Sequence, residues 1–424
     1  MNSWAVIAAG AVLAGYAAVS RKLSTTAVSG PMVFVACGLA VGPLGLDLVD
    51  RARDAEVTRA LLESALSLLL FCGAVAVRRR DLRRERALPV RLLAAGLPLT
   101  MALGWLVAWA LLPGLGLWEL AVVAIALAPT DAALGQRAVS DRRVPALVRH
   151  GLDVESGLND GVALPFFLLA LAAAAGGEHG HQGPLAAFFL ALVASSAIGL
   201  AAGLLGARAL GASAARGWST PGWRQILVLT VPATAYALCA VVDGSGFIGA
   251  WTAGLAFGAV RRGTARAPGS DVPREGGAPS EIEFTDRLGE VLTALAFLVF
   301  GAVILGPTLE HADWRTVLYA VLSLTVVRAV PVALALAGSG LRAPTTAYIG
   351  WFGPRGLASL VFGLIAFEEG LPGADLVSGV IVVTVALSVC AHGASAAFLG
   401  ARYGAWYADA LRRDPGLREN APAR

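Results

Sequence analysis

Runs of apolar residues, separated by short polar stretches, follow one another along nearly the whole chain. Each run is about as long as the ~20 residues that a helix needs to cross the hydrocarbon core of a bilayer. The pattern predicts an all-α polytopic membrane protein with about thirteen transmembrane helices. The expected spans are about 3–20, 29–46, 57–77, 89–112, 117–137, 145–175, 184–210, 223–243, 245–261, 284–306, 314–336, 343–368 and 375–402.

Composition agrees with this pattern. Of the 424 residues, 57% are hydrophobic and only 15% are charged, whereas a soluble domain carries about a quarter charged residues. We therefore interpret residues 1–424 as a single membrane transport unit rather than an enzyme. The net charge of +4 comes from arginines gathered in loops, which indicates membrane topology and no nucleic-acid partner. The four cysteines and five histidines have no metal-binding or haem spacing, so no cofactor is expected.

The arginines also predict the orientation of the chain. They concentrate in the connections that follow odd-numbered spans, and most of the other connections have neither Arg nor Lys. The exception is the loop at 47–56, where two arginines are accompanied by four acids. Because positively charged loops remain in the cytoplasm, we expect a multi-pass protein of the cell (inner) membrane, with its N-terminus outside and its C-terminus inside. The loop at 262–283 is expected to be a cytoplasmic linker.

Two spans are interrupted by polar residues at matching places. Span five breaks at Pro129-Thr130-Asp131, and span twelve breaks at Gly353-Pro354-Arg355-Gly356. These are the fifth elements of two groups of six spans, which predicts an inverted repeat of spans 1–6 and 8–13. Paired interruptions of this kind indicate the midplane site of a transporter.

The first break offers ligands for a small cation. A proline break frees backbone carbonyls, and in a membrane such a break must face protein or a water-filled cavity. The freed carbonyls and the Thr130 hydroxyl are hard oxygen donors. Asp131, at the amino end of a half-helix, would oppose the positive end of the helix dipole. The alternative is a simple proline kink with Asp131 as its cap.

Span six carries a second set of polar residues. Ser156 and Asp160 are four residues apart and share one helical face, and Glu155 and Asn159 share a neighbouring face. Asp160 lies about halfway along the span, where an ionised carboxylate without a partner is costly. Such a carboxylate can bind either a proton or a cation, and this competition would couple the two fluxes. The alternative is that Asp160 forms a static buried ion pair.

Two arginines lie near the middle of their spans, Arg328 in span eleven and Arg355 in span twelve. A buried arginine stays charged and needs an anion. We expect Glu155 to pair with Arg328, which would leave Asp131 and Asp160 freer. Arg355 would either pair with another acid or hold the crossed half-helix ends. Near the start of span six, Arg149, His150 and Asp153 would either line an inner funnel or be solvated.

The segments Ala-Pro-Thr-Asp-Ala-Ala-Leu-Gly at 128–135, Val-Glu-Ser-Gly-Leu-Asn-Asp-Gly at 154–161 and Gly-Trp-Phe-Gly-Pro-Arg-Gly-Leu-Ala-Ser at 350–359 resemble the NhaP-like sodium/proton antiporters. These belong to the monovalent cation:proton antiporter-1 family. The resemblance extends over about residues 5–400. It implies thirteen helices, crossed discontinuous helices (spans 5 and 12) and a homodimer. It implies core helices at about 57–175 and 284–368, and dimerisation or scaffold helices at about 3–46, 184–261 and 375–402.

Carried over to this sequence, the resemblance implies that Asp160 exchanges the proton and the cation. Thr130, Asp131 and Ser156 would complete a Na⁺ site, and Glu155 with Arg328 would form a structural pair. Asn159 marks the electroneutral branch of the family. One departure concerns span three, where many relatives carry an acid and this chain reads Cys72-Gly73. A cation ligand or its support is therefore expected to be missing there.

Together, these features predict an electroneutral secondary-active antiporter that exchanges Na⁺ for H⁺, with Li⁺ or K⁺ as other candidate cations. A K⁺/H⁺ antiporter, a sodium-coupled organic-solute symporter of similar fold and a transport-inactive sensor remain as alternatives. Sequence alone does not choose the preferred cation. Membrane lipid, monovalent cations, protons and a second copy of the chain are the expected partners.

Overall fold

The computed structural model describes residues 3–23, 26–49, 54–76, 87–175, 184–264, 281–310 and 312–420. Within these ranges all regular structure is helical, and nine helices are long and apolar enough to cross a membrane. The predicted all-α polytopic fold is thereby confirmed. Most of the predicted linker at 262–283 lies outside the described residues.

The described helices follow the order of the predicted spans. Continuous helices are α1 (Ser3–Leu23), α2 (Gly30–Val41), α3 (Ala55–Ala76), α9 (Ala146–Ala174), α10 (Pro184–Ala215), α11 (Pro221–Val241), α12 (Gly246–Thr264) and α19 (Ala374–Arg413). Five further spans consist of joined pieces: α5 (Ala87–Arg91), η1 (Leu92–Gly96) and α6 (Leu97–Leu111); α7 (Leu117–Ala126) and α8 (Ala132–Ser140); α13 (Glu283–Val299), η2 (Phe300–Leu305) and α14 (Gly306–Leu309); α15 (Trp314–Leu324) and α16 (Val326–Ala335); α17 (Ala343–Trp351) and α18 (Leu357–Glu368).

The two interruptions that the sequence predicts separate α7 from α8 and α17 from α18. A third interruption, at Thr325 between α15 and α16, was not predicted. There the backbone leaves helical geometry at φ −113° and ψ −85°, and the Thr325 hydroxyl donates to the Val321 carbonyl at 2.7 Å. A hydroxyl that bonds back to the preceding turn competes with regular helical bonding. The interruption precedes α16, which carries Arg328.

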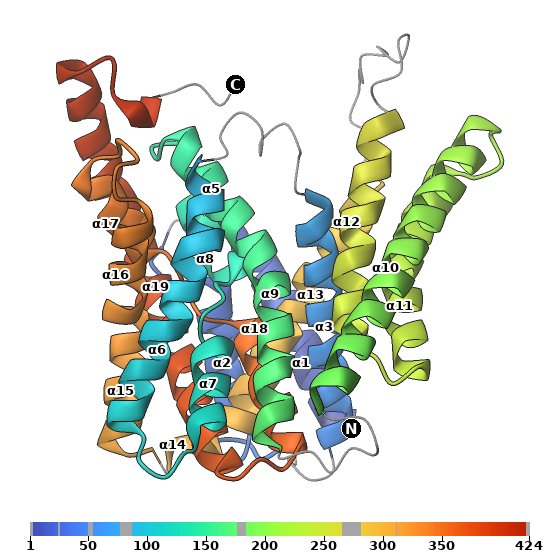
Figure 1. Ribbon diagram of the computed structural model, residues 1–424, viewed down its shortest axis with the longest axis horizontal. Coiled ribbons are helices and arrows are strands. Elements are labelled where there is room, and N and C mark those ends of the chain that lie inside the picture. The colour runs from blue at the N-terminus through green and yellow to red at the C-terminus, as the bar shows by residue number, and fades with distance from the viewer. Residues whose placement is uncertain are drawn as a thin grey trace. The chain divides into compact units, whose positions relative to one another are not determined.

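The chain divides into two compact units. The first comprises Met1–Glu63, Arg80–Gly177 and Leu292–Arg424, and the second comprises Ser64–Arg79 and Glu178–Val291. In the second unit, α10, α11 and α12 pack side by side (Figure 1). Their contacts enclose an apolar cluster that includes Phe71, Val228 and Phe257.

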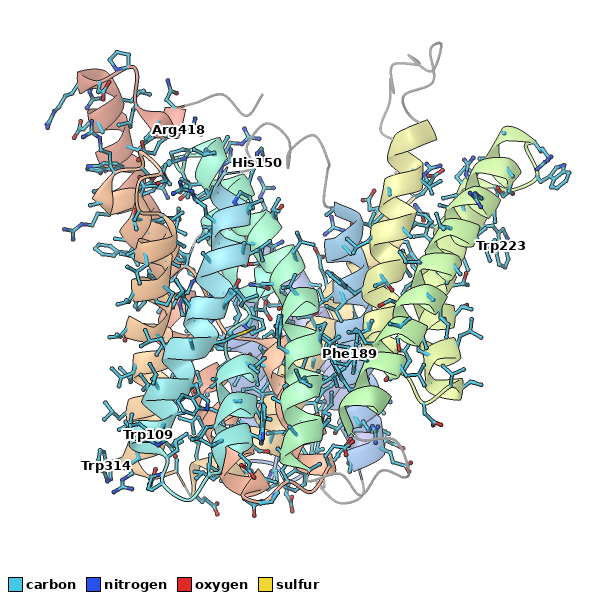
Figure 2. The ribbon with its side chains drawn as sticks, in the orientation of Figure 1. Trp109, His150, Phe189, Trp223, Trp314 and Arg418 are labelled. Atoms are coloured by element: carbon cyan, nitrogen blue, oxygen red, sulfur yellow. The ribbon has the colours of Figure 1, made fainter. Side chains whose placement is uncertain are left out.

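The first unit contains both interrupted helices. In it α7 packs against α6 and α9, and α19 packs against α15 and α18. Trp109 and Trp314 lie at one end of this unit, and His150 and Arg418 lie at the opposite end (Figure 2). Tryptophan side chains gather where a membrane meets water. Arg342, in one of the arginine-containing connections, lies at the end marked by Arg418, because it bonds to Glu419 and to Asp414.

After α19, the chain turns back onto the beginning of α17. The short 3₁₀ helix η3 (Arg418–Asn420) contains Glu419, whose side chain is only 1% exposed. Its carboxylate accepts hydrogen bonds from the Arg342 amide at 2.8 Å and from the Thr345 hydroxyl at 2.7 Å. Free amides at a helix N-terminus need acceptors of this kind. The tail segment 414–420 therefore completes the N-terminal end of α17.

Candidate ion-binding site

The two interruptions meet in the first unit. The Asp131 amide donates to the Pro354 carbonyl at 2.8 Å, so the two broken backbones are joined directly. The Asp131 carboxylate accepts from the Leu134 amide of α8 at 3.0 Å and from the Leu357 amide of α18 at 2.8 Å. Gly356 allows this approach, since a Cβ at its position would collide with the carboxylate. One aspartate therefore caps two half-helices.

This role for Asp131 differs from the expectation that it would be left freer. Both of its oxygens are engaged with backbone amides, and the side chain is 7% exposed. Each carboxylate oxygen keeps a second lone pair. The cap and the ligand were treated as alternatives at the first break, and the structure shows the cap.

Arg355 bonds to the backbone at the C-terminal end of α7, whereas Asp131 caps helix N-terminal ends. Its side chain is fully buried, and Nη1 donates to the Ala128 carbonyl at 2.5 Å and to the Pro129 carbonyl at 3.0 Å. Its backbone amide donates to the Ser388 hydroxyl of α19 at 2.7 Å. Of the two roles expected for Arg355, the structure shows that it holds a half-helix end. The carbonyls freed at the C-terminal end of α7 thus meet a cation.

Four polar side chains of the predicted site gather where α9 passes the first break. The Thr130 and Ser156 hydroxyl oxygens are 2.9 Å apart, and Asn159 Nδ2 donates to the Thr130 oxygen at 2.6 Å. Asp160 lies half-buried on α9, close enough to Asp131 for the two charges to repel. Asp160 Oδ1 is buried and has no hydrogen-bond partner among the described residues. Asn159 Oδ1 is also buried without a partner among the described residues. Two buried acceptors without donors are unusual in a folded protein.

Glu155, on the neighbouring face of α9, pairs with Arg328 of α16. The two guanidinium nitrogens lie 2.6 and 2.8 Å from the two carboxylate oxygens, and both side chains are at least 98% buried. Arg328 also lies against Gly353, where a Cβ would collide with the guanidinium. The pair thus connects α9 to α16 beside Gly353 of the second break. The charge of Glu155 is therefore compensated by Arg328, and Asp160 takes no part in this ion pair.

A small cavity leads to this cluster between α8, α9 and the break that follows α17. Its volume is about 10 Å³, roughly enough for one water molecule. Ser156 and Asp153 are the polar side chains on its wall. The remaining side chains are apolar and include Ala138, Val139, Leu152, Phe352 and Pro354.

The second unit shows what surrounds the departure in span three. The Cys72 thiol of α3 lies within hydrogen-bonding reach of the Asp286 carboxylate of α13. A carboxylate therefore lies beside the position where many relatives were expected to carry an acid. No sequence pattern indicated this proximity, because the two residues belong to different spans that are far apart along the chain. It depends on how α3 and α13 pack.

Comparison with known proteins places the chain in a family. The sequence model described as "Sodium/hydrogen exchanger, transmembrane" matches residues 8–402. A Na(+)/H(+) antiporter of Saccharomyces cerevisiae is 33% identical over 144 residues, which are 32% of this chain and 14% of that protein. The Na(+)/H(+) antiporter 2 of Zygosaccharomyces rouxii is 31% identical over 150 residues, or 33% of this chain and 18% of that protein. The alignments thus cover less than a fifth of either curated relative.

Solved structures agree with the fold. The sodium proton antiporter MjNhaP1 from Methanocaldococcus jannaschii at pH 8 has a TM-score of 0.74, with 21% identity, and the match covers 92% of this chain and 99% of that one. At this identity the likeness establishes the fold. The family predicted from the three motifs is confirmed by the match to 8–402. Because that match extends over nearly the whole sequence and the fold agrees with it, the chain belongs to the transmembrane sodium/hydrogen exchanger family.

Proposed function

We propose that this protein is an electroneutral antiporter that exchanges Na⁺ for H⁺, with Asp160 carrying either ion. The observation that supports this most directly is the buried, unpartnered Oδ1 atom of Asp160, which lies one turn after Ser156 on α9, and Ser156 in turn contacts the Thr130 hydroxyl. Burial makes an isolated carboxylate charge costly, so the group is best stabilised by a bound proton or a bound cation. Because the two ligands compete for one group, loading one requires release of the other.

The neighbouring residues suit this role. Thr130 and Ser156 offer hydroxyl oxygens, which are hard ligands that can replace the water around an alkali cation. Asn159 is neutral and donates to Thr130, so it adds no second titrating charge. Glu155 is occupied by Arg328. We therefore assign the cation to Thr130, Ser156 and Asp160, with Asp131 as an additional ligand through its free lone pairs.

The decisive experiment measures cation-dependent collapse of a pH gradient in proteoliposomes, with Na⁺, Li⁺ and K⁺ in separate arms. Asp160→Asn should abolish exchange while the protein remains folded, because an amide preserves the volume and cannot trade a proton for a cation. Asp243→Asn is the matched control. Asp243 lies in an exposed turn with φ 53°, a conformation that Asn adopts readily. Wild-type rates in Asp160→Asn would eliminate the mechanism.

The same assay separates the alternatives. Exchange with K⁺ and none with Na⁺ would make the protein a K⁺/H⁺ antiporter. Absence of exchange with every alkali cation would leave a symporter or a transport-inactive sensor.

We also propose that the protein works as a homodimer in the cell membrane, with its N-terminus outside. Support for the orientation comes from the first unit, where the end marked by Trp109 and Trp314 is opposite the end marked by Arg418 (Figure 2), to which Arg342 also belongs. Labelling of single introduced cysteines with an impermeant reagent tests the orientation. Mass measurement in detergent tests the dimer.

A further inference from the structure

The cavity beside Ser156 contains an acid that the proposed exchange does not use. Asp153 is exposed, and it lines the cavity together with Ser156, whose hydroxyl lies 2.9 Å from that of Thr130. We propose that Asp153 is an access residue: it draws the cation into this cavity from the cytoplasm and sets the affinity of the inward-facing site. This inference rests on the proposed function, because it assumes that Ser156 and Asp160 receive the cation.

The helix places Asp153 on the correct face. Positions 153, 156 and 160 are three and four residues apart, so they form one stripe along α9. Asp153 precedes Ser156 by about one turn and Asp160 by about two, which is about 10 Å along the helix axis. His150, one turn earlier still, lies at the end of the unit shown in Figure 2. The stripe therefore leads from that end of the helix to the unpartnered oxygen of Asp160.

Apart from an electrostatic interaction with His150, one turn earlier on α9, the surroundings leave the charge of Asp153 exposed to an approaching cation. Among the described residues that line the cavity, Asp153 is the only charged one. The guanidinium of nearby Arg149 donates to the Val144 carbonyl at 3.0 Å, and Arg143 is paired with Asp141. The cavity has room for about one water, so a cation entering it must shed most of its hydration. A carboxylate at the cavity wall compensates for part of that loss.

Coulomb's law gives the size of the effect. Two unit charges about 10 Å apart, in a medium of effective dielectric constant between about 20 and 80, change a binding constant about twofold to fifteenfold. Because the side chain is exposed, salt should reduce the effect, since the screening length is about 10 Å at 0.1 M ionic strength. Asp153 should therefore alter affinity from one side of the membrane and leave the maximal rate unchanged.

The test compares everted and right-side-out vesicles from a host without exchangers of its own. Asp153→Asn and Asp153→Ser should raise the KM for Na⁺ at the cytoplasmic face about twofold to fifteenfold. The KM at the external face and the maximal rate should not change. Asp153→Glu should restore the wild-type KM, and added N-methylglucamine chloride should reduce the difference. Asp409→Asn is the matched control, because Asp409 is an exposed acid of α19 outside the cavity.

Each result decides the inference. A cytoplasmic KM that is unchanged in both charge-removing variants overturns it, as does an equal rise in KM at the two faces. Loss of all exchange in Asp153→Asn and Asp153→Ser, with the folded protein present, also overturns it by showing a role in transport itself. Failure of the proposed function has a different signature, since the wild-type protein would then exchange no cation or Asp160→Asn would remain active.

Discussion

The two interrupted helices use side chains of opposite charge to satisfy the free backbone groups at their breaks. The break between α7 and α8 carries a carboxylate, and Asp131 uses it to accept from amides at the starts of α8 and α18. The break between α17 and α18 carries a guanidinium, and Arg355 uses it to donate to carbonyls at the end of α7. Each break therefore supplies the charge that the helix ends around the crossing require.

The difference assigns separate tasks to the two breaks. The first contains the Thr130 hydroxyl and meets the polar face of α9, so it contributes ligands to the proposed ion site. The second contains a buried cation and no acid, and it is supported by Arg328 and by Ser388. In the proposed site, the first break contributes ligands, and the second break holds the first in place through Arg355.

The largest expected effect concerns the pair beneath the second break. Removing one member of a buried ion pair leaves an uncompensated charge, which costs about 3–5 kcal/mol. Glu155→Ala and Arg328→Ala should each lower the free energy of unfolding in detergent by that amount, and the double variant should lose less than the sum. The exposed pair Arg287–Glu290 is the control, where either deletion should change the free energy of unfolding little, because solvent screens the pair. Additive losses for Glu155 and Arg328 would show that they do not support the break together.

Arg355→Gln should have the next largest effect. Each buried carbonyl that loses its donor costs about 1–3 kcal/mol, so loss of both bonds to Ala128 and Pro129 should cost about 2–6 kcal/mol, less whatever the amide recovers. Denaturant unfolding measures the loss, and Arg412→Gln on the exposed end of α19 is the control. Unchanged stability would mean that the first break does not depend on the second.

Asp131→Asn should have a smaller effect. The amide oxygen can replace one acceptor, and its NH₂ group cannot accept from the second backbone amide, so a loss of about 1–2 kcal/mol is expected. Asp313→Asn is a matched control, because Asp313 caps the start of one helix only, α15, where it accepts from the Thr316 amide. Equal losses of stability in the two variants would show that a carboxylate that caps two half-helices stabilises the fold no more than one that caps a single helix.

The smallest expected effect is that of membrane potential. If the ligand-bearing break and α9 offer one exchangeable charge, each cycle moves one cation against one proton and does no electrical work. In proteoliposomes with equal Na⁺ and pH gradients, a potential of about 100 mV set by valinomycin and K⁺ should drive no net Na⁺ movement. Net movement would require a second proton carrier, with Asp131 or Glu63, an acid of α3 that pairs with Arg59, as candidates.

Sequence patterns predicted much of this arrangement. Apolar runs located the spans because a membrane forces long apolar helices, and Pro129 and Pro354 located the breaks because proline cannot continue the backbone ladder. Depth in the membrane suggested that Glu155 and Arg328 would meet. The partners of Asp131 and Arg355 were not predictable in this way, since each bonds to backbone of the other break. Backbone groups leave no trace in the residue types.

Three other features depend on local or tertiary contacts that residue types alone do not specify. The interruption at Thr325 arises from a hydroxyl that resembles many others in apolar spans. The contact between Cys72 and Asp286 depends on how two helices pack. Docking of Glu419 on α17 depends on a turn after a helix that extends to Arg413, beyond the predicted span.

That last contact has a consequence for how the protein is made. Glu419 follows Arg342 by 77 residues, so the start of α17 lacks its acceptor until much of the remaining chain has been synthesised. At about 5–20 residues per second, the delay is about 4–15 s. The start of the half-helix that precedes the second break is thus secured only after α19 has been made. A ribosome that stalls within α19 would leave a chain in which the start of α17 lacks its Glu419 acceptor.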